Sequence, residues 1–283
     1  MPPRPMPTKP AAADLEADLS RLVQAVGASA KYRPICRELV EHIGRQELAK
    51  RRNLREAVKA TKNKLHQVGG AYLPDQTRYA AWLAELREVQ QPAGLRPLCR
   101  KIMEAHASTR ERLPILDEFY ATTLAGLPPL GSVLDLACGL NPLALPWLPV
   151  ADGATYWAMD IYEDMMAFVR DFLALPLVEV RGHVQVRDVL QLGSLPRVDL
   201  ALVLKAIPCL EQMDKAAGAK LLDMIQADYV LVSYPAHSLG HRDKGMVANY
   251  EARFRQLVAG RPVQVRRFQF SGELAFLISA KKV

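Results

Sequence analysis

The sequence has few of the residue patterns that hold metals or form disulfides. Its four cysteines are Cys36, Cys99, Cys138 and Cys209. They form no Cys-x-x-Cys pair, and of the six histidines only His237 and His241 lie close together, with no further ligand at a suitable spacing. Because neither a disulfide framework nor a zinc site fits this spacing, we expect no metal and a reducing compartment.

Long hydrophobic runs and a secretory signal are also missing. The apolar runs are short and interrupted by charge or proline, and the first ten residues, MPPRPMPTKP, contain no continuous apolar segment. These absences argue against a membrane span and a signal peptide. With 50% hydrophobic residues in 283, the chain can fill a core, and we expect a globular cytoplasmic protein.

Positive charge is concentrated in one segment near the N-terminus. Between Lys31 and His66 there are eleven Lys and Arg against four Glu, an excess equal to the net charge of +7 of the whole chain. The segment is either a solvated helix face or a surface that binds a polyanion. Because the whole charge excess lies in this one segment, nucleic acid is the favoured partner. The cations expected to bind RNA are Lys31, Arg51, Arg52, Arg55, Lys59, Lys62 and Lys64.

The first part of the chain has the periodicity of helices. After a tail over 1–12 that we expect to be disordered, helices are predicted within 13–26, 34–43, 46–66 and 77–89. In the third, apolar positions from Leu54 to Leu65 repeat on one face while Arg55, Lys59 and Lys62 line another. No strand is expected before about residue 105, so we predict an all-helical domain over 13–105.

From residue 106 to 283, strand and helix patterns alternate. Strands are predicted at 132–137, 154–160, 183–188, 198–205, 228–234, 263–270 and 274–280, with helical segments such as 162–175 and 214–227 between them. Alternation of this kind predicts βαβ units, and the short link at 271–273 predicts an antiparallel hairpin at one edge. The fold class is therefore α/β, a seven-stranded, mostly parallel, Rossmann-like sheet.

The turn after the first strand, CGLNP, is a candidate cofactor seat. In open α/β sheets ligands bind beyond the carboxyl ends of the strands. Gly139 permits close backbone approach, Asp160 ends the next strand at a distance suited to ribose hydroxyls, and Asp188 ends the third, near an adenine amino group. A nicotinamide dinucleotide fits poorly, because GxGxxG needs three glycines and this turn has one. A phosphate-free nucleoside such as S-adenosylmethionine fits better.

The segment HASTRER, 106–112, adds a possible anion site. Ser108 and Glu111 match a capping box, which by itself marks only a helix start. A helix N-terminus beside Arg110 also suits a carboxylate, so we expect the amino-acid end of the cofactor there.

Six stretches follow one another in a pattern that is highly specific. They are SAKYRPICRELV, KNKLHQVGGAYLP, HASTRERLPILDEFY, VLDLACGLNPLALPWL, VLKAIPCLE and SYPAHSLGHRDKGMVANYEARF. Through them the chain resembles the aminoglycoside-resistance 16S rRNA (guanine-N7) methyltransferases of the Arm, Rmt and Sgm type. The resemblance implies a class I S-adenosylmethionine methyltransferase domain, preceded by a helical domain that docks on 16S rRNA in the 30S subunit, in a protein we expect to be monomeric.

The resemblance also assigns roles to single residues. Arg110 matches a carboxylate-binding arginine, Gly139 a loop glycine, Asp160 a ribose ligand, Asp188 an adenine-side ligand and Lys205 a lysine near the reaction centre. The full set expected to bind cofactor is His106, Ser108, Thr109, Arg110, Ala137, Gly139, Asn141, Asp160, Ile161, Asp188, Val189 and Lys205. The sequence departs from the family at His237 and at Gly240-His241-Arg242.

The reaction that the resemblance implies requires no general base, because guanine N7 already carries a lone pair. The protein then has to supply geometry and exclude water. We expect Lys205, Tyr234, Arg242 and Met246 around the reacting base, although Met246 also suits a core position and Tyr234 a strand end. In A-form RNA, N7 faces a narrow groove, so the base is expected to be turned out of its stack.

Two other functions compete with this one. A ribosome-binding or assembly factor could keep the fold without turnover, and a small-molecule methyltransferase could use the helices as a lid. Calorimetry with S-adenosylmethionine distinguishes the first alternative from the rRNA methyltransferase. Methylation of a metabolite in the absence of ribosomes distinguishes the second.

Overall fold

The computed structural model describes residues 12–70, 77–191, 193–236 and 245–280. The predicted disordered tail therefore lies almost wholly outside the described residues, as do His237, His241 and Arg242. Among the described helices, none is both long and apolar enough to cross a membrane.

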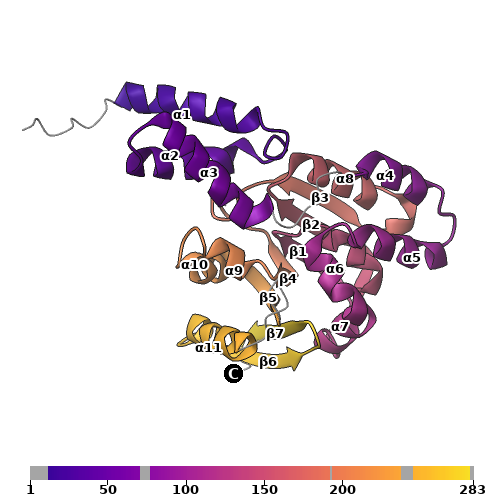
Figure 1. The fold of residues 1–283 in the computed structure, drawn as a ribbon. Helices are drawn as coiled ribbons and strands as arrows, with labels where there is room; N and C mark the ends of the chain where they lie inside the picture. The colour runs from indigo at the N-terminus through magenta and orange to yellow at the C-terminus, as the bar shows by residue number, and fades with distance from the viewer. Residues whose placement is uncertain (1–11, 71–76, 192, 237–244, 281–283) are drawn as a thin grey trace, which may run out of the picture.

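Three N-terminal helices form a unit of their own (Figure 1). They are α1 (Ala12–Gly27), α2 (Arg37–Lys50) and α3 (Leu54–Leu65). Leu22 and Val26 of α1, Leu39 and Ile43 of α2, and Leu65 of α3 are almost completely buried. The three helices thus bury their apolar stripes mainly against one another.

The boundary between α2 and α3 differs from the prediction. Residues 46–50, expected at the start of the third helix, continue α2, and α3 begins only at Leu54. The side chain of Asn53 accepts a hydrogen bond from the Glu56 backbone N–H at 2.9 Å and caps the new helix. A short π-helix, η1 (His66–Gly70), follows α3.

Helices α4 (Tyr79–Arg87) and α5 (Pro92–Met103) pack against the second half of the chain. The ring of Tyr79 stacks on Phe168 at 5.2 Å, and Arg96 donates to the carbonyl oxygen of Pro146 at 2.7 Å. The sequence analysis did not identify α5, which contains Pro97. These contacts attach α4 to α8 (Glu163–Leu173) and α5 to η3 (Asn141–Trp147), whereas the domain division at residue 105 stays a prediction.

The central sheet has the predicted seven strands. They are β1 (Leu130–Leu136), β2 (Val150–Asp160), β3 (Arg181–Val186), β4 (Arg197–Leu204), β5 (Gln226–Pro235), β6 (Val263–Gln269) and β7 (Glu273–Ala280). Their order is β3-β2-β1-β4-β5-β7-β6, with β1 to β5 parallel and β7 antiparallel to both of its neighbours. The predicted fold class is confirmed, including the hairpin at one edge.

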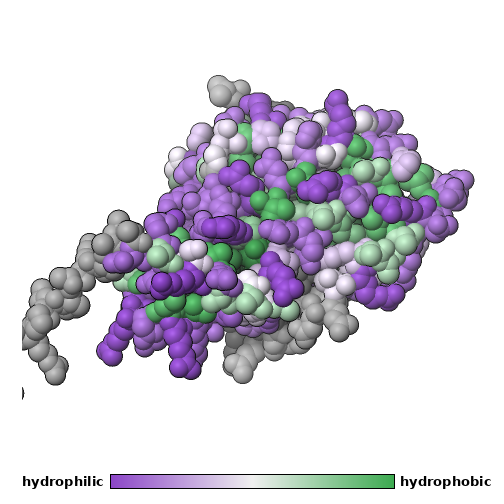
Figure 2. All heavy atoms as spheres, turned by 90° about the horizontal axis from the view of Figure 1, so that it is seen from above, coloured by the Kyte–Doolittle hydropathy of each residue, from purple (hydrophilic) through white to green (hydrophobic). Residues whose placement is uncertain are grey.

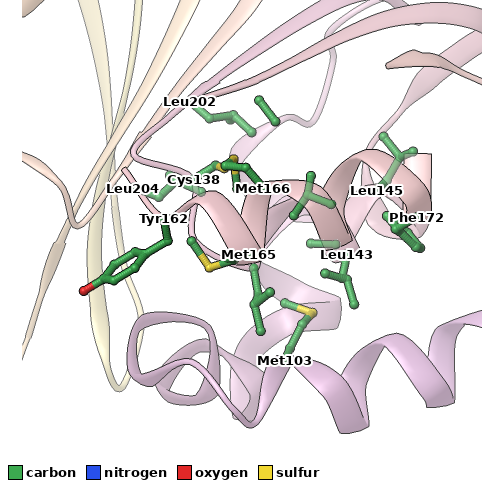
Figure 3. Packing of buried hydrophobic residues seen from close by; sticks show 14 of the residues in the cluster. Met103, Cys138, Leu143, Leu145, Tyr162, Met165, Met166, Phe172, Leu202 and Leu204 are labelled. Carbon is green, nitrogen blue, oxygen red and sulfur yellow. The ribbon is translucent and has the colours of Figure 1, made fainter. Parts of the chain in front are cut away.

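Helices cover both faces of this sheet. The remaining ones are α6 (Ala107–Arg112), η2 (Leu113–Ile115), α7 (Leu116–Thr123), η3 (Asn141–Trp147), α8 (Glu163–Leu173), η4 (Pro176–Val178), α9 (Ile207–Leu210), α10 (Ala217–Met224) and α11 (Met246–Val258). In β4, Leu200 and Leu202 face one apolar cluster, while Ala201 and Val203 face the other. Figure 3 shows the first cluster, where Met166 and Phe172 of α8 pack beside Leu143 of η3. Because β4 is buried on both faces, its sequence is an almost continuous run of apolar residues.

Candidate active site

A pocket opens beyond the carboxyl ends of β1, β2 and β4. The empty space within it, including the open solvent at its mouth, is about 690 Å³. From β1 the chain continues outward through β2 and β3 on one side, and then returns to β4 on the other side of β1. The pocket therefore lies at the topological switch point of the sheet.

Two strained residues form the pocket walls at this switch point. Ala137, directly after β1, has φ 51°, and Lys205, directly after β4, has φ 57°. Left-handed backbone costs a non-glycine residue about 1–2 kcal/mol. Both residues line the pocket. Strain on both sides of one cavity is typical of a functional site.

Asp160 organises the turn after β1. Its Oδ2 accepts the Gly139 N–H at 2.8 Å and its Oδ1 accepts the Ile161 N–H at 2.7 Å. Burial raises the pKa of Asp160, and the hydrogen bonds from these backbone N–H groups oppose the rise. Asp160 is also in the pocket lining, so the carboxylate that fixes the turn is available to a ligand.

Gly139 is needed for a reason other than the one predicted. Its φ is +54°, and a Cβ at this position would come within 2.8 Å of the His106 ring. The group that approaches this backbone in the structure is therefore the imidazole of His106 from α6. Gly139 itself does not line the pocket, whereas His106 does.

Helix α6 starts differently from the predicted capping box. The residue before it is His106, and Ser108 lies inside the helix without acting as a cap. Glu111, the expected partner of Ser108, instead accepts a hydrogen bond from Lys205 Nζ at 2.9 Å. The capping-box interpretation is wrong, because the chain enters α6 two residues earlier and Glu111 faces a buried ammonium group.

Lys205 lies within a cluster of charged and polar groups. Its Nζ is 2.9 Å from Glu111 Oε2, 3.4 Å from Glu273 Oε2 and 3.3 Å from the carbonyl oxygen of Ser108. Only 5% of its side chain is exposed. The ammonium group is therefore held in place at the pocket wall.

His106 is buried and remains neutral. Burial, followed by the nearby cations Lys205 and Arg112, lowers the pKa of His106 to about 4. The unfolded chain, with an ordinary histidine pKa of about 6.5, takes up this proton first as the pH falls. The stabilisation associated with neutral His106 is therefore complete above pH 6.5 and is lost as the pH approaches 4.

The variant His106→Asn tests this pH dependence. Between pH 7 and pH 4.5, the difference in unfolding free energy between wild type and variant should change by about 2 kcal/mol, with the wild type losing more. Urea unfolding at both pH values measures it. A difference that is the same at both pH values would contradict the assignment.

The predicted cofactor residues divide into two groups. Eight line the pocket: His106, Ser108, Ala137, Asp160, Ile161, Asp188, Val189 and Lys205. Four do not: Thr109, Arg110, Gly139 and Asn141. Thr109 Oγ1 donates to the Met103 carbonyl oxygen at 2.6 Å, and Arg110 is exposed at the surface of α6.

Asn141 belongs to a buried network and not to the pocket wall. Its amide donates to Asp135 at 2.9 Å, and its oxygen accepts from Arg112 and from Tyr120. Only 2% of the residue is exposed. Its amide and its oxygen are thus engaged inside the protein, and its role in binding the cofactor stays a prediction.

The structure describes three of the four residues expected around the reacting base, Lys205, Tyr234 and Met246. Tyr234 is 2% exposed, stacks on Tyr250 at 5.0 Å and meets Phe254 and Phe276 edge-on. Tyr234 therefore packs in the core, and its place beside the reacting base stays a prediction. Met246 is half-buried at the start of α11, and Arg242 lies outside the described residues.

The predicted RNA-binding cations lie on and beside the helical unit. Lys31, Arg51, Arg52, Arg55 and Lys59 are exposed, and Lys62 and Lys64 are half-buried. Figure 2 shows hydrophilic side chains projecting from the end of the molecule where α1–α3 lie. Glu47, which is 1% exposed in its side chain, pairs with Arg51 and with Lys64. Lys64 therefore also links α3 to α2, whereas Arg51 pairs with the last turn of α2.

Sequence reasoning missed several pocket residues. Leu39 of α2 and Val68 and Gly69 of η1 come from the helical unit, and Met213 follows α9. The backbone of Cys36 also donates to the Ile161 carbonyl oxygen at 2.7 Å. No motif marks these positions, although two of the stretches that carry the family resemblance contain Leu39, Val68 and Gly69.

The fold and the site define a Rossmann-like methyltransferase domain. The sheet has the strand order and the reversed seventh strand described above, and its switch-point pocket has carboxylates at two strand ends and no phosphate-binding glycine loop. Among the described residues, no three His, Cys, Asp or Glu side chains gather as metal ligands.

The comparisons with known proteins identify the family. A model described as ribosomal RNA methyltransferase (FmrO) matches residues 28–277. The chain belongs to this family. It is 35% identical to the 16S rRNA (guanine(1405)-N(7))-methyltransferase of Micromonospora rosea, covering 92% of this chain and 96% of the relative. It is 37% identical to the enzyme of the same name from Frankia casuarinae, over 93% of this chain and 94% of that relative.

Solved structures agree. The 16S rRNA methyltransferase RmtF, in complex with S-adenosyl-L-homocysteine, is 30% identical and superposes with a TM-score of 0.79 over 93% of this chain and 98% of RmtF. The 16S rRNA methylase RmtB is 27% identical, with a TM-score of 0.75 over 93% and 98%.

Proposed function

We propose that this protein transfers the methyl group of S-adenosylmethionine to N7 of guanine 1405 in 16S rRNA, within the 30S subunit, and thereby confers aminoglycoside resistance. The observation that carries the proposal is the switch-point pocket with Asp160 and Asp188 at its rim, in a chain that belongs to the rRNA methyltransferase family. The Micromonospora and Frankia relatives are named for this reaction.

The pocket fits a nucleoside without phosphates. Its lining is mostly apolar, and its anionic groups, Asp160 and Asp188, suit the ribose hydroxyls and the adenine amino group. A diphosphate would meet two carboxylates and a turn with a single glycine. Arg110, exposed on α6 near His106, is available for the carboxylate end at the pocket mouth.

The proposed reaction requires no acid–base catalysis by a side chain. The bound cofactor supplies an electrophilic methyl group, and guanine N7 supplies a lone pair, so no residue has to remove a proton. The protein orients the two partners and excludes water. Lys205, fixed by Glu111 and Glu273, holds positive charge at the pocket wall. We also propose that Met246, and Arg242 from outside the described residues, contact the extruded base.

The helical unit docks the enzyme on folded rRNA. The exposed cations of α3 contact phosphates, so binding weakens steeply with salt. We propose that the enzyme acts as a monomer. It needs no metal, because a nucleophilic N7 and a sulfonium methyl donor, which leaves as a neutral thioether, require no Lewis acid.

Expression in a susceptible bacterium tests the proposed function. We expect resistance to 4,6-disubstituted aminoglycosides, and primer extension should stop at guanine 1405 once the RNA has been reduced with borohydride and cleaved with aniline at N7-methylguanine. Asp160→Ala is the control, which should give neither. Resistance without modification of this guanine, or modification elsewhere, would contradict the proposal. Methylation of a metabolite without ribosomes would favour the small-molecule alternative.

A further inference from the structure

One face of α2 lies against the segment that carries Asp188. Glu38, His42 and Gln46 follow one another at four-residue spacing, so they share a helix face. Glu38 Oε2 accepts the backbone N–H of Asp188 at 3.3 Å, and His42 Nδ1 is 3.1 Å from Asp188 Oδ2. The helical unit thus reaches the pocket wall through both the backbone and the side chain of one residue.

The contacts of the His42 ring define which nitrogen carries the proton. The Asp188 carboxylate, 3.1 Å from Nδ1, can only accept, so the proton lies on Nδ1, and Nε2 accepts from the Gln46 amide at 2.9 Å. His42 Nδ1 then donates to the carboxylate of Asp188. His42 is therefore oriented as a donor, with 21% of its side chain exposed, away from the pocket lining.

The carboxylate of Asp188 has capacity left for a ligand. Its Oδ1 accepts the Leu190 N–H at 3.0 Å and its Oδ2 accepts from His42, whereas a carboxylate has about four acceptor sites. Its side chain is only 2% exposed and it lines the pocket. Both fixed contacts restrict its rotation, so the acceptor sites that remain point in a defined direction.

We propose that His42 is a positioning residue that orients the Asp188 carboxylate toward the exocyclic amino group of adenine, so that a residue of the rRNA-docking unit sets which purine the pocket accepts. This inference rests on the proposed function, because it takes the cofactor to be an adenine nucleoside. A base with an oxygen in place of the amino group would bring an acceptor against the carboxylate and would be rejected.

The test compares S-adenosylhomocysteine with S-inosylhomocysteine, which carries an oxygen at that position. Calorimetry on the full chain gives the ratio of the two dissociation constants. Wild type should prefer the adenine form, and His42→Leu should lower this preference about tenfold, the effect of freeing one charge-assisted hydrogen bond. His42→Asn, whose amide nitrogen replaces Nδ1, should restore the preference. His183→Leu, on exposed β3, is the control and should leave both affinities unchanged.

Each other outcome is decisive. A preference unchanged in His42→Leu, or an equal loss of affinity for both nucleosides, would overturn the positioning role, since a merely structural wall residue does not distinguish the bases. If wild type binds neither nucleoside, the proposed function fails and this inference fails with it.

Discussion

Replacing Arg55, Lys59 and Lys62 together with glutamine should lower methylation of 30S subunits by at least about 100-fold at physiological salt. Arg55 and Lys59 are exposed on α3, and Lys62 is half-buried beside them. Each lost phosphate contact removes about one unit from the slope of log affinity against log salt, so the slope should fall by about three. Filter binding to 30S subunits across salt concentrations measures it.

The affinity for S-adenosylmethionine should not change in this variant, because none of the three side chains lines the pocket. The matched control replaces Arg87, Arg170 and Arg181, which are exposed on α4, α8 and β3, with the same loss of charge. That control should retain methylation. Full activity of the α3 variant on subunits, or an equal loss in both variants, would contradict the docking assignment.

The sheet was predictable because its strands have a strong local signal. All seven predicted segments overlap observed strands. In the central strand β4, burial on both faces requires an apolar run, VDLALVL, whereas the edge strands β3 and β6 are largely exposed and alternate apolar with polar residues. Asp160 and Asp188 were found for a related reason, namely that the carboxyl ends of parallel strands meet at one edge of the sheet.

Features that depend on tertiary contacts were not predictable. The break between α2 and α3 falls within a run of charged residues with no glycine or proline, and only the Asn53 cap marks it. Tyr234 looked available at a strand end, but α11 covers it. Leu39 and His42 reach the pocket region from a segment nearly 150 residues away, which no local pattern encodes.

Removal of one partner of the buried Arg112–Glu273 pair should destabilise the protein strongly. Both side chains are 0% exposed, and two guanidinium nitrogens of Arg112 donate to Glu273 at 2.7 and 3.0 Å. Burial alone would lower the pKa of Arg112 and raise the pKa of Glu273, but their mutual attraction reverses both shifts. Arg112→Met should therefore cost about 3–5 kcal/mol in unfolding free energy, measured by urea unfolding, since it leaves a buried carboxylate poorly compensated.

The double variant Arg112→Met with Glu273→Leu distinguishes a missing charge partner from a packing defect. Removing both charges avoids the uncompensated carboxylate, so the double variant should be more stable than Arg112→Met alone. It still loses the hydrogen bond from Arg112 to Asn141 and one of the two carboxylates near Lys205. Some loss of stability should therefore persist. A double variant that loses as much as the two single variants added together would mean that the pair contributes through shape and not through charge.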